Sequence, residues 1–509
     1  MNLVKSLILG SAAALVAVGG AQAADLPVKA KAVEYVKVCS LYGPGFYYIP
    51  GTDTCIKLGG YLRVDVLANT NSVAGPNYNG ANGANNRFTN GYTWRSREDL
   101  NVDTRTATEY GVVRTYFDAV FTWTSDTYAG QGNGSTVYSA IGSTQAPNNA
   151  SAGGVAAGTV GVYYAFIQFA GFTIGKAVSQ FAAPWTAYPG NNFDGLVGGA
   201  NTVTGVNQFT YTAQFGNGVA LSLSAQDQTQ YSQAGVNNLS AGGAYGASDY
   251  AGSVAPDLIA ALKVDQAWGI FQASFAAHDN HAAYFGGTEL TGHPDDKWGW
   301  AGALALSIKN IPTGPGDTIN IQGVYTDGAT RYNIQDLASQ AGSIAMFGGT
   351  NLPGVYGSVG FGTAPDTVFV NGSQQETIKT WGMRGAYTHN WDPYWNTSLY
   401  GAYASVMYSD TAKTWICGVG GVGGTFRTAF GTGVTSCNPD YSLAQIGLIT
   451  RWTPVKNLTF SADVTYSHLD QKYAGVVTTS STAIGKPAAT YELKNQDTVM
   501  LLLRAQRNW

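Results

Sequence analysis

The chain has 509 residues, of which 45% are hydrophobic, 12% aromatic and only 11% charged, and its formal net charge is −4. An ordinary globular domain carries about 25% charged residues, and a disordered chain would combine few aromatic residues with a high net charge. The acidic balance also excludes the basic surface that nucleic-acid binding requires, so we expect no nucleic-acid partner. The composition therefore predicts an ordered protein that is not a typical soluble domain.

The first residues predict export. Lys5 precedes a short apolar stretch from Leu7 to Val18, and Ala21-Gln22-Ala23 supplies the small residues that a signal peptidase accepts. We therefore expect a secretory signal peptide that is cleaved after Ala23. Beyond it, no stretch approaches the roughly 20 apolar residues of a membrane-spanning helix, which excludes a helical membrane protein.

Four cysteines fall into two local pairs, Cys39 with Cys55 and Cys417 with Cys437. An even number of cysteines in an exported chain indicates disulfides, and these two pairings are one of three possible connectivities. No CxxC spacing occurs and no histidine lies close to either pair in the sequence, so zinc is a poor alternative. We expect two structural disulfides, and neither a metal site nor a cofactor.

Much of the remaining chain alternates between apolar and polar residues with a period of two. Three segments show the pattern well: Ile56 to Leu67, Val113 to Trp123, and Leu458 to Tyr466. Each would place apolar side chains on one face of a strand and polar side chains on the other, as in a barrel between lipid and water. A soluble sandwich alternates as well, so the periodicity alone does not separate the two folds.

The connections between these segments separate the two folds better, because short turns alternate with long polar stretches. Short turns are expected at Gly171, Gly216 to Gly218, Ala267 to Gly269, Trp391 to Pro393 and Pro454 to Lys456. Long stretches run from Asn69 to Asn90, Gly130 to Gly158, Tyr231 to Ser253, Arg331 to Gln374 and Ala412 to Asp440. Short periplasmic turns and long extracellular loops are typical of outer-membrane barrels.

We therefore predict an all-β fold, a transmembrane antiparallel β-barrel of about 16 strands, with an uncertainty of about two strands. The barrel must be closed, because each unpaired backbone group in lipid costs several kcal/mol.

The end of the chain predicts the last strand of this barrel. Alternate residues from Val499 to Ala505 are apolar, and the chain ends on the aromatic residue Trp509. Transmembrane barrels commonly end in this way, and Trp509 resembles the signal that the outer-membrane barrel assembly machinery reads. Arg507 departs from the apolar pattern, and we expect its long side chain to reach the membrane interface.

The segment from Cys39 to Arg63 reads CSLYGPGFYYIPGTDTCIKLGGYLR. It closely resembles the opening signature of alphaproteobacterial porins, with its Cys–aromatic–Gly segment, PGTDTC and GGY-R. The resemblance implies an outer-membrane homotrimer of 16-stranded barrels, each with its own pore for passive diffusion of small hydrophilic solutes and ions. Outer-membrane lipid and lipopolysaccharide would surround it. We accordingly expect a signal peptide at residues 1–23, a periplasmic N-terminal segment at 24–54 and the barrel at 55–509.

The family architecture implies that the third long loop folds inward and narrows the pore. The candidate loop runs from Phe181 to Gly195, and its one acidic residue is Asp194. Opposite it, alternation collects cations on one wall, because residues two apart on a strand share a face and lie about 6.8 Å apart. We predict a pore constriction made by Asp194 and four arginines: Arg63, Arg95, Arg97 and Arg114. A basic wall facing an acidic loop would orient dipolar solutes and set ion preference.

Simpler interpretations of these residues stay open. The arginines could pair with neighbouring acids and stiffen a wet wall, the candidates being Asp65, Glu98, Asp99 and Asp103. Asp194 could simply end a turn, since Asp-Gly is a common turn pair. Lys176 alternates in phase with Ile174, so we expect it to face outward and leave it out of the constriction.

Three rival functions differ in what they require of the sequence. A barrel enzyme needs a nucleophile and a base within reach, but no GxSxG or HExxH motif occurs, and we expect no enzyme. A secreted adhesin or β-solenoid would show repeats of fixed period, which are absent. A substrate-specific channel for a sugar or an anion is the closest rival, because Trp185, Tyr188 and Phe193 lie in the candidate loop.

Overall fold

The computed structural model describes residues 37–69, 92–124, 159–185, 196–200, 205–227, 234–334, 343–419, 422–478 and 488–509. It divides into two compact units, residues 1–56 and residues 57–509. The expected signal peptide and the start of the expected periplasmic segment lie outside the described residues, so both stay predictions.

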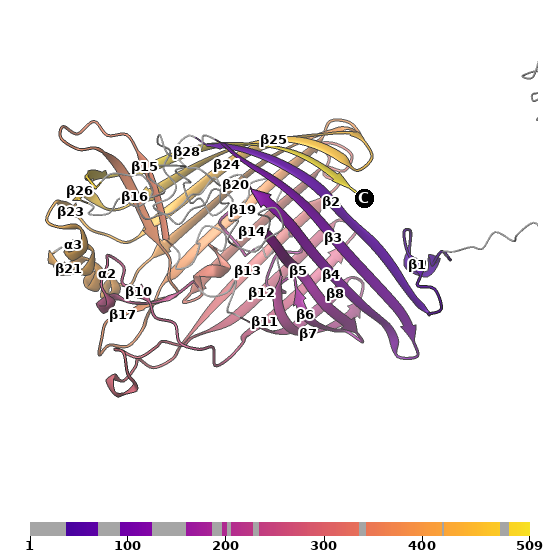
Figure 1. Cartoon of the computed structure of the whole chain (residues 1–509), viewed down its shortest axis with the longest axis horizontal. Helices are drawn as coiled ribbons and strands as arrows, with labels where there is room; N and C mark the ends of the chain where they lie inside the picture. The colour runs from indigo at the N-terminus through magenta and orange to yellow at the C-terminus, as the bar shows by residue number, and fades with distance from the viewer. Residues whose placement is uncertain are drawn as a thin grey trace, which may run out of the picture. The chain divides into compact units, whose positions relative to one another are not determined.

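The larger unit forms a closed antiparallel barrel of 16 strands, whose strands run side by side across Figure 1. The first half of the barrel contains β2 (Thr54–Asn69), β3 (Tyr92–Thr108), β4 (Gly111–Thr124), β5 (Thr159–Phe169), β6 (Phe172–Ala177), β7 (Val206–Gly216), β8 (Val219–Gln226) and β11 (Asp257–Gln266). The second half contains β12 (Gly269–Asn280), β13 (Lys297–Lys309), β14 (Thr318–Asp327), β19 (Lys379–Asn390), β20 (Trp395–Met407), β24 (Tyr441–Val455), β25 (Leu458–Gln471) and β28 (Gln496–Asn508). The predicted fold class is confirmed.

Closure of the barrel depends on its first and last strands. β28 pairs antiparallel with β2, from the Tyr61–Asn508 pair to the Asn69–Met500 pair. Trp509 continues this pairing, because its backbone N–H donates to the Gly60 carbonyl at 3.1 Å. No sheet edge is left to face lipid, which is the condition that a β-protein must meet to cross a membrane.

The two faces of each strand follow the alternation expected from the sequence. On β2, Leu62 is 53% exposed on the outside, while Asp65 and Leu67 are fully buried inside. On β4, Phe117 and Phe121 are likewise exposed on the outer face. None of the helices in the described ranges is long and apolar enough to cross a membrane.

The short turns lie where the sequence places them, with one shift. β24 continues to Val455, through an irregularity in its pairing with β25 after Trp452, so its turn is Lys456-Asn457 and begins at the end of the expected Pro454–Lys456. Asn457 has φ +68°, a conformation that asparagine tolerates better than most residues. Two further turns escaped prediction, at residues 109–110 and 310–317. The first, Glu109-Tyr110, contains no Gly, Asn, Asp or Pro, and the second is long.

The long connections are more structured than their polar composition suggested. They contain short strands and helices: β9 (Val236–Asn238), β10 (Ala247–Ser248), β15 (Ser343–Gly348), β16 (Gly357–Thr363), β17 (Thr367–Phe369), β18 (Glu376–Thr377), α2 (Asp410–Cys417), α3 (Thr425–Phe430), β23 (Val434–Ser436), β26 (Ala474–Thr478) and β27 (Thr490–Leu493). Many of these elements gather at the left end of the barrel in Figure 1. Two long connections that were not predicted, residues 281–296 and 472–495, lie at the same end of the strands.

These loops share a hydrophobic core of their own. Met346 from the β14–β19 connection, and Ile416 and Phe426 from the β20–β24 connection, are fully buried in one cluster. Tyr245 packs there too, and its hydroxyl contacts that of Tyr473. Burial raises the pKa of the Tyr245 hydroxyl above its ordinary value, since the charged form is desolvated. The loops therefore form a packed cap rather than a set of separate polar segments.

Both predicted disulfides are present. Cys39 and Cys55 have Cα atoms 6.1 Å apart, and Cys417 and Cys437 have Cα atoms 5.6 Å apart, within the usual range for a disulfide. The first bond lies within the smaller unit, where β1 (Tyr47–Tyr48) pairs with Cys55 and Ile56. The second ties the end of α2 to the residue after β23.

Candidate functional site in the barrel lumen

The third long connection, between β6 and β7, folds into the barrel. Its first part contacts strands that are not its neighbours. The Ser179 hydroxyl donates to Gln226 Oε1 on β8 at 2.8 Å, and Gln272 Nε2 on β12 donates to the Gln180 and Ala182 carbonyls at 3.2 and 2.8 Å. These contacts hold residues 179–182 against the inner face of the wall.

The second described part of this loop, residues 196–200, is held still farther around the barrel. The Arg384 guanidinium on β19 donates to the Leu196 and Ala200 carbonyls, both at 3.1 Å, and its Nε donates to Gln322 Oε1 at 3.0 Å. The Val197 N–H donates to Gln445 Oε1 on β24 at 3.0 Å. The inward third loop, expected from the family resemblance, is therefore confirmed.

A glycine permits this close contact. Gly198 has φ +88°, and a Cβ atom there would lie 2.4 Å from the Met383 carbonyl oxygen of β19. A larger residue would both strain the backbone and push the loop off the wall, so glycine is required at this position.

Small residues on the inner wall make room for the loop. Phe181 is fully buried, with its ring 4.5 Å from that of Tyr332, in a cluster with alanines of β12 and β13. Ala276 and Ala301 are also fully buried beneath it. Because alanine projects little from the sheet, the loop packs directly on these strands.

The opposite side of the lumen carries arginines and acids. Asp65 is fully buried between two guanidiniums: Arg95 Nη2 lies 2.6 Å from Asp65 Oδ2, and Arg504 Nε lies 2.6 Å from Asp65 Oδ1. Arg95 is itself only 2% exposed, whereas the Arg504 side chain is 13% exposed. This arrangement joins β2, β3 and β28 across the seam where the barrel closes.

A second group of the same kind lies on β3 and β4. Asp103 Oδ2 is 2.9 Å from Arg105 Nη2 and 3.0 Å from Arg114 Nη2, and Arg114 Nη1 donates to Gln168 Oε1 on β5 at 2.9 Å. The two arginine side chains are 29% and 28% exposed, but the Asp103 side chain is only 10% exposed. The guanidiniums therefore face the water and the carboxylate lies behind them.

Aromatic rings support the remaining arginines. The Arg63 guanidinium lies 4.2 Å from the Tyr61 ring centroid, and its Nε donates to Gln506 Oε1 at 2.8 Å. The Arg97 guanidinium lies 5.8 Å from the Tyr163 ring centroid. Rings at these distances stabilise a cation through their π-electrons without neutralising its charge.

The structure thus places all four predicted arginines on the inner face of neighbouring strands. Two of them, Arg95 and Arg114, make the acid pairings that were the simpler interpretation. Glu98 does not pair with them, because it lies opposite Phe121 on the outer face. Asp194 lies outside the described residues, so its part in a constriction stays a prediction. Lys176 donates to the Val162 carbonyl at 2.8 Å.

Sequence reasoning missed four arginines of the lumen: Arg105, Arg384, Arg451 and Arg504. Alternation could have revealed Arg384 and Arg504, whose neighbours Met383 and Leu503 are apolar and face outward, but it gives a weaker signal for Arg105, which lies between Thr104 and Thr106. Alternation along the strand would still not have shown that Arg384 binds the loop, because Leu196 is distant from it in the sequence.

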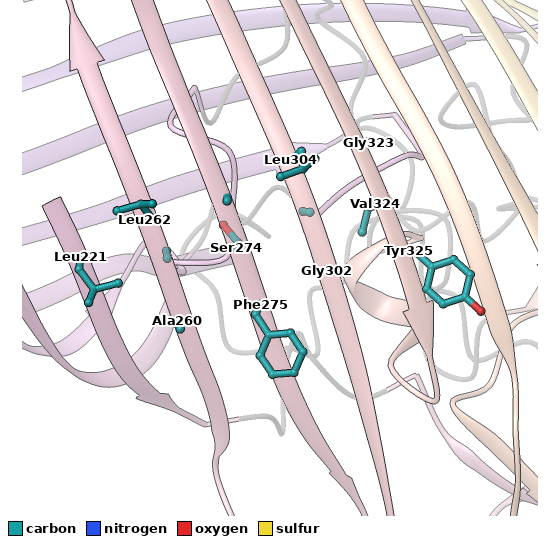
Figure 2. Close-up of a pocket in the computed structure, with 13 residues that line it drawn as sticks. Leu221, Ala260, Leu262, Ser274, Phe275, Gly302, Leu304, Gly323, Val324 and Tyr325 are labelled. Atoms are coloured by element: carbon teal, nitrogen blue, oxygen red, sulfur yellow. The ribbon is translucent and has the colours of Figure 1, made fainter. Parts of the chain in front are cut away.

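A depression of about 590 Å³ lies elsewhere, on the outer face of β8 and β11 to β14. In Figure 2, Phe275 and Tyr325 stand on either side of Gly302, and Leu304 and Leu262 lie above them. Leu304 is 60% exposed, so this apolar surface faces lipid rather than the lumen. Among the described residues, no group of three or more His, Cys, Asp or Glu side chains could hold a metal ion.

Comparison with known proteins agrees with this geometry. A family model described as "Porin subfamily" matches residues 25–502. Porin Omp2b of Brucella suis biovar 1 is 34% identical over 281 residues, which cover 54% of this chain and 66% of that protein. Porin Omp2a of Brucella melitensis biotype 1 is 36% identical over 231 residues, or 44% of this chain and 57% of that protein. The matches thus span less than two thirds of the length of these relatives, which are named as porins.

A solved structure shares the fold. The outer membrane channel DcaP of Acinetobacter baumannii superposes with a TM-score of 0.55 at 16% sequence identity, over 91% of this chain and 99% of that one. At this identity the likeness concerns the architecture alone.

Proposed function

The chain belongs to the porin subfamily and lies in the outer membrane, and we propose that it forms a passive, water-filled diffusion channel for small hydrophilic solutes and ions. One observation carries this proposal. The loop that enters the barrel is fastened to one wall, while side chains on the other wall remain accessible to water, as the 28% exposure of Arg114 indicates. A barrel of this width has an aqueous lumen, and the described part of the loop narrows this one without covering Arg114.

We further propose that the constriction predicted from the sequence lies between this loop and the arginines. Arg63, Arg97 and Arg114 lie on β2, β3 and β4, whereas the hydrogen bonds described above hold the loop on β8, β12, β19 and β24. The passage for solutes therefore runs along the first three arginines.

The outer surface supports assembly into a homotrimer. Glu98 lies on the outer face of β3, between the strand ends, where a charged side chain against hydrocarbon would be destabilising. A neighbouring copy of the chain that covers the outer face of β2 to β4 and supplies a donor would remove this cost. Lipid and lipopolysaccharide would then surround the rest of the barrel, where Leu304 and Phe275 are exposed.

The C-terminal strand supports recognition by the barrel assembly machinery. Trp509 is 52% exposed at the end of β28, which closes the barrel. Arg507 lies beside the β24–β25 turn and donates to the Lys456 carbonyl, so its charge is held at the strand end rather than in the apolar band. This contact is compatible with the expected placement of Arg507 at the membrane interface.

The function is tested by the conductance of purified, refolded protein in planar lipid bilayers. A trimeric open channel predicts stepwise openings in groups of three, with conductance that rises linearly with salt concentration. Saturation by one solute would indicate the substrate-specific alternative instead. Protein that is folded by heat-modifiability yet conducts no current would contradict the proposal, and boiled protein provides the matched control.

A further inference from the structure

We propose that the channel selects anions over cations, because the most exposed charged groups on the described inner face of β2, β3, β4 and β28 are guanidiniums. This inference rests on the proposed channel function and adds the sign of its selectivity. It concerns the surface formed by Arg63, Arg95, Arg97, Arg105, Arg114 and Arg504, which we call the arginine wall.

The first support comes from the exposed fractions of the side chains in the two groups in which one aspartate lies between two arginines. Asp65 is 0% exposed, and its partner Arg504 is 13% exposed. Asp103 is 10% exposed, and its partners Arg105 and Arg114 are 29% and 28% exposed. In both groups two guanidiniums share one carboxylate, so each group keeps a formal charge of about +1. In both groups the most exposed side chain is an arginine.

The second support comes from the acids that lie between these groups. Asp99 and Asp118 are only 4% and 6% exposed, and they are diagonal neighbours on the inner face of β3 and β4. Asn101 donates to Asp99 at 3.2 Å, and the Tyr116 hydroxyl donates to Asp118 at 3.5 Å. Both carboxylates therefore expose little of their surface to a cation passing in the water.

The third support is the way in which the exposed guanidiniums are held. Arg63 lies over Tyr61, and Arg114 lies 5.1 Å from the Tyr116 ring centroid and 5.5 Å from that of Phe166. An aromatic neighbour fixes a guanidinium without neutralising it, as at Arg63, and Arg114 shares the single negative charge of Asp103 with Arg105. Planar guanidiniums are suited to carboxylate and phosphate oxygens.

These features act together on a passing ion. The described part of the arginine wall brings six arginines together with four aspartates, Asp65, Asp99, Asp103 and Asp118. A lumen lined by an excess of one charge in a low-dielectric wall concentrates ions of the opposite sign. Chloride, and small carboxylates or phosphates, should therefore pass more readily than potassium.

The test is the reversal potential of the purified channel across a KCl gradient in a planar bilayer. We expect the potential to take the sign of the chloride equilibrium potential. A conducting channel with no selectivity, or with preference for potassium, would overturn this inference while leaving the proposed channel function intact. Absence of any conductance would overturn both.

Variants locate the selectivity on the arginine wall. The double variant R105Q/R114Q leaves Asp103 without its cations and should lower the chloride-to-potassium permeability ratio by about twofold or more. D103N should raise this ratio. R507Q removes one positive charge from the outer face of β28 and should leave the ratio unchanged, so a shift in R507Q of at least half that of the double variant would contradict the assignment to the lumen.

Discussion

The two sides of the lumen are built from the same alternating strands but differ in the size and charge of their inward residues. β12 and β13 turn small residues inward, such as Ala276, Ala301 and Ala303, and the third loop packs on them. β2, β3 and β4 turn arginines and aspartates inward, while the hydrogen bonds that hold the described parts of the loop are to β8, β12, β19 and β24. The loop therefore rests on the wall whose inward side chains are small. The charged side chains of the opposite wall face the solute.

The stability of the two walls should also differ, because one depends on buried ion pairs and the other on packing. Asp65→Leu would leave Arg95 buried without its carboxylate. Losing one partner of a buried pair typically costs about 3–5 kcal/mol, so we expect the largest loss of unfolding free energy here. Urea unfolding of the refolded protein, followed by heat-modifiability on gels, measures this loss.

Asp103→Asn provides the matched control on the same wall. Its partners Arg105 and Arg114 are more than a quarter exposed, and exposed pairs contribute about 1 kcal/mol or less. Equal losses in the two variants would show that burial does not distinguish the two groups.

Fastening of the loop to its wall depends on Arg384. Arg384→Met would remove its hydrogen bonds to the Leu196 and Ala200 carbonyls and to Gln322. Hydrogen bonds to a charged group contribute about 1.5–3 kcal/mol, so the loop should detach part of the time. We expect a larger and noisier single-channel conductance with little loss of barrel folding.

Arg451→Met is the control for this change. Arg451 also faces the lumen, but its hydrogen bonds are to Asn396 and Ser398 on β20 rather than to the loop. If Arg451→Met raised the current noise as much as Arg384→Met does, the effect would come from lost lumen charge and not from release of the loop.

Packing beneath the loop gives the smallest expected effect. Ala303→Leu would insert a larger side chain on the inner face of β13, where Ala303 is 6% exposed. Overpacking typically costs about 1–3 kcal/mol, and the displaced loop should alter the conductance. Ala273→Leu adds the same atoms to the outer apolar depression, and there we expect neither change. Similar results for both variants would contradict the packing of the loop on β13.

The barrel could be predicted because its physical rules are local. Alternation sets the face of each residue, and glycine or asparagine marks turns such as Asn217-Gly218, so even the inward placement of Arg63 and Arg114 follows from the sequence. The turn at residues 310–317 was missed because it is long and its Gly and Pro residues resemble those of a loop on the other side.

Contacts between distant segments could not be predicted in the same way. The bond from Arg384 to Leu196 joins residues almost 190 positions apart, and no local pattern marks it. The loop core around Met346, Ile416 and Phe426 was also missed, because each loop contributes only a few apolar residues among many polar ones.

The most direct test of the central claim, that the arginine wall lines an open channel, is the accessibility of a cysteine introduced on β4. All four native cysteines are in disulfides, so an introduced cysteine is the only thiol that can react. Arg114→Cys should react with a bulky water-soluble thiol reagent, and the single-channel conductance should fall. Phe117→Cys, on the outer face of the same strand, should leave the conductance unchanged after the same treatment. If Arg114→Cys reacted without any change in current, or did not react in a conducting channel, the account of the lumen would be wrong.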